Sequence, residues 1–255
     1  MKKLSLLLGV SFALFFAVSG ANAQENPRTW APMEIIGCTL INDASMDDFD
    51  RAVDSWNDWM DRNDMNNYAA FVLTPQFVSP ESEYDVGWLG AWADAASLAD
   101  MQTWLADGGD VRAEFDEVID CPLHQALAIN NVKPIGEVPE DSVVPVEFTN
   151  CTLNAGMGGA AAHDALIRWT EYLTANGSNA GHWVMRPGPG EVPDAGYSFK
   201  WTVAYPTWAD AAHDFDLYFN QGGDQRMAAL LGPYFSCDNS RVYNSQNVRD
   251  ILVEE

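Results

Sequence analysis

The sequence predicts an α+β fold in which a β-α-β-β-α-β unit occurs twice. Two observations support this: landmark residues recur at a constant shift of 113 residues, from Glu34 to Glu147, and the apolar pattern alternates between helical and strand periodicity. The chain has 255 residues, of which 47% are hydrophobic and 12% aromatic. Such a composition is typical of a protein with a packed core and excludes a disordered chain.

The repeat rests on rare residues that match in the same order. The pairs include Cys38 with Cys151, Trp56 with Trp169, Trp88 with Trp201 and, after small insertions, Cys121 with Cys237. Because tryptophan and cysteine are rare, such an ordered series indicates an internal duplication. We therefore expect a first repeat at 24–131, a proline-containing acidic linker at 132–146 and a second repeat at 147–255.

The elements of the first repeat follow from its periodicity. Apolar residues between Phe49 and Met60 keep the spacing of three and four that marks one helical face. The full expectation is strands at 34–40, 68–73, 84–92 and 123–130, with helices at 46–62, 95–105 and 111–118. Gly108 and Gly109 end the second helix. This order is the ferredoxin-like arrangement, and the second repeat follows it.

The N-terminus predicts a secretory signal peptide over residues 1–23. Lys2 and Lys3 precede an apolar run over 4–18, and Ala-Asn-Ala at 21–23 forms a cleavage signal. An uncleaved membrane anchor is the alternative. Cleavage would place the mature chain in the periplasm or outside the cell, and no later segment is apolar enough to span a bilayer.

Charge excludes two classes of partner. Lys and Arg total 13 against 37 Asp and Glu, so the net charge is -24. Nucleic-acid and anionic-lipid surfaces are bound through clustered cations, which this chain lacks. We therefore expect no nucleic-acid partner and no membrane contact once the leader is removed.

Two fused ferredoxin-like units, each with a short helix before its fourth strand, resemble the dimeric α+β barrel superfamily. That group includes the antibiotic-biosynthesis-monooxygenase, EthD and NIPSNAP families and the haem-binding chlorite dismutases. The resemblance lies in the pattern of elements and not in a signature motif. It implies two four-stranded sheets that face each other as a pseudo-dimer, helices on the outside, and ligand pockets between sheet and helices.

The ferredoxin-like arrangement also implies how the cysteines pair. Its first and fourth strands are neighbours, and each repeat has one cysteine late in the first strand and one at the start of the fourth. We expect the disulfides Cys38–Cys121 and Cys151–Cys237, which suit an oxidising compartment. A metal site is the alternative, but no C-x-x-C spacing supports it.

The candidate ligand site lies in the second repeat, where imidazoles and cations occur at strand positions that carry neither in the first. His182, Arg186 and Lys200 are expected to form a positive pocket for a small anion or carboxylate. The further candidates are Trp169, Trp201 and His213. The alternatives are that the cations pair with nearby acids, that the histidines have no special role and that the tryptophans are ordinary core.

The sequence supports three hypotheses for function. The first is a secreted small-molecule-binding protein with its pocket in the second repeat. The second is an enzyme, either of the cofactor-independent monooxygenase type or with haem held by a histidine of the second repeat, as in the chlorite dismutase relatives. The third is a protein-interaction module. No metal-binding template, phosphate loop or Ser-His-Asp motif is present, and ligand and oligomeric state are not specified.

Overall fold

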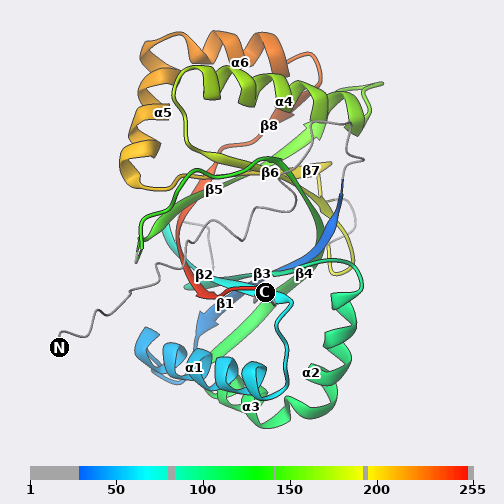
Figure 1. The fold of residues 1–255 in the computed structure, drawn as a ribbon, viewed down its shortest axis with the longest axis vertical. Helices are drawn as coiled ribbons and strands as arrows, with labels where there is room; N and C mark the ends of the chain where they lie inside the picture. The colour runs from blue at the N-terminus through cyan, green and yellow to red at the C-terminus, as the bar shows by residue number, and fades with distance from the viewer. Residues whose placement is uncertain (1–28, 80–83, 141, 192–194, 252–255) are drawn as a thin grey trace, which may run out of the picture.

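A computed structural model describes residues 29–79, 84–140, 142–191 and 195–251. Within them, one antiparallel sheet is flanked on two opposite sides by helices (Figure 1). The expected signal peptide at 1–23 lies outside the described residues. None of the described helices is both long and apolar enough to cross a bilayer.

The first half of the chain follows the expected order of elements. These are β1 (Ala31–Leu40), α1 (Met46–Arg62), β2 (Tyr68–Phe77), β3 (Val86–Trp92), a 3-10 turn (Ser97–Asp100), α2 (Met101–Asp107), α3 (Gly109–Val118) and β4 (Ile119–Lys133). Helix α1 has the expected bounds, whereas β4 is longer than expected at both ends. Its extension has a tertiary cause, because β4 pairs with β1 along one edge and with β6 along the other.

The second half has the same order up to its last strand. Its elements are β5 (Val144–Leu153), α4 (Gly159–Ala175), β6 (Gly181–Pro187), β7 (Phe199–Ala204), α5 (Trp208–Asn220), α6 (Gly223–Leu231), β8 (Phe235–Cys237) and β9 (Arg241–Arg249). The strands β4 and β5 extend into the range 132–146 that the sequence suggests as a linker. The final strand is divided into β8 and β9, both of which pair with β5.

The sheet closes on itself. Its strand order is β7-β6-β4-β1-β3-β2-β9-β5-β8, and β7 also pairs with β5, which completes a ring. Two joints hold the halves together: β4 pairs with β6, and β2 pairs with β9. Helices α1, α2 and α3 lie on one side of the ring and α4, α5 and α6 on the other (Figure 1).

The apolar residues form three cores. One lies between the first-half strands and α1–α3 and includes Phe49, Trp56 and Trp88. A second lies between the second-half strands and α4–α6. The third fills the interior of the ring with residues such as Met33 and Met185. Strand alternation explains this division, because successive side chains point to the ring interior and to the helices.

Both expected disulfides are present. Cys38 bonds to Cys121, and Cys151 bonds to Cys237. Each bond joins neighbouring strands, β1 to β4 and β5 to β8, as the ferredoxin-like order implies. Structural disulfides persist in oxidising environments, so this pairing indicates that the protein works outside a reducing cytosol.

Candidate functional site

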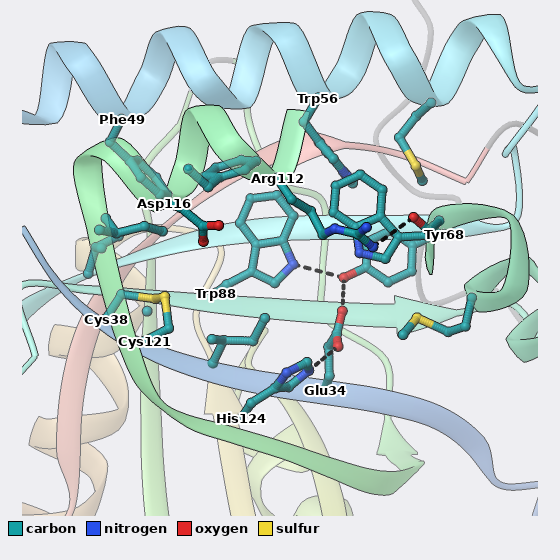
Figure 2. Close-up of a pocket in the computed structure, with 18 of the residues that line it drawn as sticks. Glu34, Cys38, Phe49, Trp56, Tyr68, Trp88, Arg112, Asp116, Cys121 and His124 are labelled. Carbon is teal, nitrogen blue, oxygen red and sulfur yellow. Dashed lines mark hydrogen bonds and ion pairs between the residues drawn. A yellow bond between two sulfur atoms is a disulfide. The ribbon is translucent and has the colours of Figure 1, made fainter. Parts of the chain in front are cut away.

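A cavity of about 350 Å³ lies in the first half, between the sheet and helices α1–α3 (Figure 2). We call it the first-half cavity. Its wall is mainly apolar and is rich in aromatic residues, which include Phe49, Trp56, Trp88, Trp92, Trp104 and Phe115. Its volume is within the range of about 300–1,000 Å³ that is typical of small-molecule sites.

A buried carboxylate lies at the floor of this cavity. Glu34 in β1 is only 8% exposed. The Tyr68 hydroxyl donates to Glu34 Oε1 at 2.5 Å, and His124 Nε2 lies 2.6 Å from Glu34 Oε2. The Trp88 indole N–H donates to the Tyr68 hydroxyl at 2.8 Å, so the four side chains form one hydrogen-bonded chain (Figure 2).

A glycine makes this arrangement sterically feasible. Glu34 is paired with Gly90 of β3, and a Cβ atom at Gly90 would lie 1.7 Å from the Tyr68 hydroxyl. The phenol therefore occupies the space that any other residue at position 90 would fill. This allows Tyr68 to reach across β3 to a carboxylate on β1.

The surroundings of Glu34 determine the charge states of its partners. Burial, with the nearby Glu34 carboxylate, raises the pKa of Tyr68 well above its ordinary value, so the phenol remains a neutral donor. The hydrogen bond to Glu34 raises the pKa of His124, although partial burial opposes this. Glu34 is thus a buried hydrogen-bond acceptor that the half-exposed His124 connects to the surface.

Further charged residues line the cavity. Arg112 of α3 donates to the backbone carbonyls of Trp104 and Leu105, at 3.0 and 3.2 Å. Asp116 lies one turn further along α3, and Figure 2 shows its carboxylate pointing toward the sheet. Asp100 precedes α2 and also lines the cavity.

The structure does not bring His182, Arg186 and Lys200 into one pocket. His182 is buried on the helix side of β6, where its ring stacks on Trp201 and its Nδ1 accepts the indole N–H at 3.2 Å. Lys200 donates to Asn150 and lies over the Tyr197 ring. Lys200 is paired with Met185, a ring-interior residue, so the sheet separates it from His182.

Arg186 lies in a separate, smaller cavity of about 230 Å³ near the start of α4. Its guanidinium stacks over Trp30, with 4.4 Å to the ring centroid. His163 lines the same cavity, and its Nε2 hydrogen-bonds to Asn130. Neither cavity contains more than one residue of the expected positive cluster.

The other candidates lie in the second-half core or at its edge. Trp169 is buried and stacks on Tyr172, and Trp201 is buried beside His182. His213 is half-exposed and pairs with Asp214 through Nδ1 at 3.0 Å. Neither tryptophan lines one of the two cavities, so both occupy core positions.

Glu34, Tyr68, Gly90 and His124 were missed by sequence reasoning. One signal was available: Glu34 is an acid within an apolar strand, and its alternation with Ile36 and Cys38 places it on the face that packs against the helices. Among 37 acidic residues, this signal is weak.

Comparison with solved structures identifies the architecture. The chain is similar to a candidate monooxygenase from Fusobacterium nucleatum, with a TM-score of 0.59 at 5% identity over 86% of this chain and 94% of that one. It is similar to a chlorite dismutase variant from Candidatus Nitrospira defluvii, with a TM-score of 0.52 at 8% identity over 86% and 92%. A haem-binding protein from Thermus thermophilus gives 0.50 at 10% identity over 87% and 93%.

The chain shares the fold of these proteins. At such low identities the likeness shows the fold alone. No protein-family model and no curated protein sequence matches the chain. The expected superfamily resemblance is therefore supported at the level of architecture.

The haem-binding protein among the similar structures raises the question whether this chain could hold haem. The two cavities do not fit it. A haem iron needs an axial ligand, such as a histidine nitrogen, facing open space. In the first-half cavity, His124 Nε2 and the Tyr68 hydroxyl are both engaged by Glu34, and in the smaller cavity His163 Nε2 is engaged by Asn130. Burial lowers the pKa of His182 to about 3, which keeps its imidazole neutral. Its Nε2 has no hydrogen-bond partner among the residues that the structure describes, but His182 lines neither cavity. Within the described residues, no group of three or more His, Cys, Asp or Glu side chains could hold a metal ion.

Proposed function

We propose that the chain binds a small, mainly apolar molecule in the first-half cavity, with Glu34 as the polar anchor. The observation that carries this proposal is the buried carboxylate at the floor of an aromatic cavity. Burying a carboxylate is costly, and the structure offsets part of that cost with donors from Tyr68 and His124. A site that orients a ligand needs a fixed polar group of this kind within an apolar wall.

We further propose that the two halves are fused ferredoxin-like repeats and that the ligand site lies in the first, which has the larger of the two cavities described here. In the first half, Trp88 donates its indole N–H to the hydroxyl of Tyr68. In the second half, Trp201 donates instead to His182, which is 2% exposed. The imidazole thus fills the second-half core, and the pocket we propose differs in position from the one that the sequence suggests.

The disulfides and the expected signal peptide support a site of action in the periplasm or outside the cell. Both disulfides join strands that carry cavity or core residues. Because disulfides persist only where thiols are not kept reduced, this fold is expected to be stable in an oxidising compartment. We propose a secreted binding protein on these grounds.

Methyl NMR of the methionines tests the proposal. Met60, Met65 and Met101 line the cavity, whereas Met33 and Met185 lie inside the ring. Titration with 2-naphthol is expected to shift the methyl signals of the cavity methionines and leave those of the ring unchanged. Uniform shifts, or none at millimolar probe, would contradict the proposal.

A matched pair of variants strengthens this test. Met101→Trp places a larger side chain in the cavity wall and is expected to weaken 2-naphthol binding by about tenfold, equivalent to about 1.4 kcal/mol. Met227→Trp is the control, because Met227 packs partly buried against the second-half core. Equal binding by both variants would place the probe elsewhere.

The second candidate function is an enzyme that removes a proton from the bound molecule. The chain from Glu34 through His124 favours it, because the His124 side chain is 54% exposed and connects a buried base to solvent. Deuterium uptake from D₂O at the acidic CH₂ of 2-indanone tests it. Glu34→Gln should abolish the acceleration; equal rates with and without protein would eliminate this candidate.

A further inference from the structure

We propose that the first-half cavity selects an organic cation, a protonated or quaternary amine attached to an aromatic or aliphatic body. This inference rests on the proposed function and specifies its ligand class. It depends on two features of the cavity, its charges and its rings.

The charges of the cavity favour a cation. Glu34, Asp100 and Asp116 contribute carboxylates, against the cationic Arg112 and the titratable His124. The guanidinium of Arg112 is already bound to two backbone carbonyls at the C-terminal end of α2, where a helix carries partial negative charge. A bound cation would therefore meet three carboxylates, against the charge of Arg112 and that of His124 when His124 is protonated.

Aromatic rings line the cavity. Trp56 and Trp88 meet at 87° with centroids 4.8 Å apart, and Tyr68 and Trp92 meet at 68° and 4.9 Å. Each pair packs edge to face in direct contact, and all four rings line the open space of the cavity. Aromatic rings that line a cavity can bind quaternary ammonium groups through their negative faces.

Two of the chain's own cations already lie over aromatic rings that line this cavity. Arg112 lies over Trp104 with 5.5 Å to the ring centroid, and Arg249 lies over Trp56 at 5.8 Å. Both distances are within the limit of about 6 Å for an attractive cation–ring contact. An anionic ligand, in contrast, would lie beside a buried carboxylate in a chain with a net charge of -24.

Two probes of the same shape separate charge from apolar fit. Phenyltrimethylammonium and tert-butylbenzene differ by one positive charge and are otherwise isosteric. Binding of each is measured by the methyl shifts of Met60, Met65 and Met101. We expect the cation to bind about tenfold more tightly, the preference that a desolvated cation–ring contact with a nearby carboxylate supplies.

Variants assign that preference to Glu34. Glu34→Gln keeps the shape and removes the charge, and it should reduce the preference to about threefold or less. Glu147→Gln is the control, because Glu147 lies in the second half beside Tyr205 and lines neither cavity. If Glu34→Gln does not fold, Asp116→Asn replaces it. Asp116 lines the cavity but is more exposed than Glu34, so we expect a smaller loss of preference.

The outcomes distinguish the two proposals. Equal affinity for both probes, or tighter binding of tert-butylbenzene, overturns the cation inference and leaves the binding function standing. A preference that survives in Glu34→Gln and Asp116→Asn also overturns it. If neither probe shifts the cavity methionines, the binding function fails and the cation inference fails with it.

Discussion

At the scale of single residues, the two halves satisfy a tryptophan N–H in different ways. Trp88 donates to Tyr68, which in turn donates to Glu34, whereas Trp201 donates to His182. A buried N–H without an acceptor would cost about 1–3 kcal/mol, so each half must supply one. The two acceptors have different consequences. The hydroxyl of Tyr68 donates in turn to the buried carboxylate of Glu34, whereas the imidazole of His182 is itself buried in the second-half core.

His182 makes stability depend on pH. Burial lowers its pKa from 6.5 to about 3 in the folded state. Between these values the unfolded chain binds a proton that the folded chain does not, so the free energy of unfolding falls as pH falls below about 6.5. His182→Gln lacks this titration, and its stability relative to wild type should rise by up to about 2 kcal/mol between pH 6.5 and 5.

Urea unfolding followed by circular dichroism at both pH values measures this difference. His124 has the opposite sign, because its raised pKa stabilises the fold at low pH and that contribution is lost as pH rises. Wild type and His182→Gln both contain His124, so its contribution cancels when their free energies of unfolding are compared. A constant difference in unfolding free energy between the two proteins would contradict the prediction.

At the scale of elements, the two long helices begin differently. Ser45 and Asp48 form a reciprocal capping box at the start of α1, in which each side chain binds the backbone of the other residue. Helix α4 begins at Gly159. Its N-cap residue, Gly158, has the extended backbone geometry of a cap but no side chain to accept a hydrogen bond. Residues after this cap face the smaller cavity.

We predict opposite effects of substitution at these two caps. Ser45→Ala removes an acceptor for a free backbone N–H and should destabilise the protein by about 1 kcal/mol. Gly158→Ser adds one in open space and should stabilise it by a few tenths of a kcal/mol. Thermal unfolding measures both, and a loss of stability in Gly158→Ser would show that its surroundings reject a hydroxyl.

At the scale of the whole molecule, the ring depends on pairings between distant parts of the chain. The last strand, β9, lies between β2 and β5 and so joins the two halves. Arg249 near its end is buried and donates to Asp61 on α1 and to the Met65 carbonyl. The disulfides also join distant parts of the chain. Their cysteines are 83 and 86 residues apart in the sequence.

The disulfides yield a whole-molecule prediction. A non-reducing digest should contain linked peptides for Cys38–Cys121 and Cys151–Cys237, and alkylation without reduction should add no mass. Replacing Cys38 and Cys121 together by serine should lower the free energy of unfolding by about 2–5 kcal/mol. Any peptide that links the two halves through cysteine would refute the pairing.

Much of the fold could be predicted because its signals are local. The helix at 46–62 follows from apolar spacing over a few turns together with its Ser45 cap. Disulfide pairing follows once the order of strands is known. The Asp-Asn-Ser run at 238–240 is a local signal for the division of the last strand into β8 and β9, but the pairing of both segments with β5 depends on the tertiary structure.

The sequence predicts a ligand site in the second half, whereas the cavity with Glu34 lies in the first. The features that form this cavity are not visible in the local sequence. Imidazoles and cations in the second half are conspicuous in an acidic sequence, whereas Glu34 is one acid among 37. Only burial distinguishes Glu34, and only strand register places Gly90 where the Tyr68 phenol needs space.

The amino-acid sequence by itself determined the class of fold, the order of most elements and the cysteine pairing, since periodicity, caps and strand order act along the chain. The tertiary structure decided which half has the aromatic cavity and which polar group lies at its floor. The physical reason is that a cavity is the volume that packing leaves unfilled: His182 fills the second-half core, whereas Tyr68 leans over Gly90 toward Glu34 and leaves the neighbouring space open.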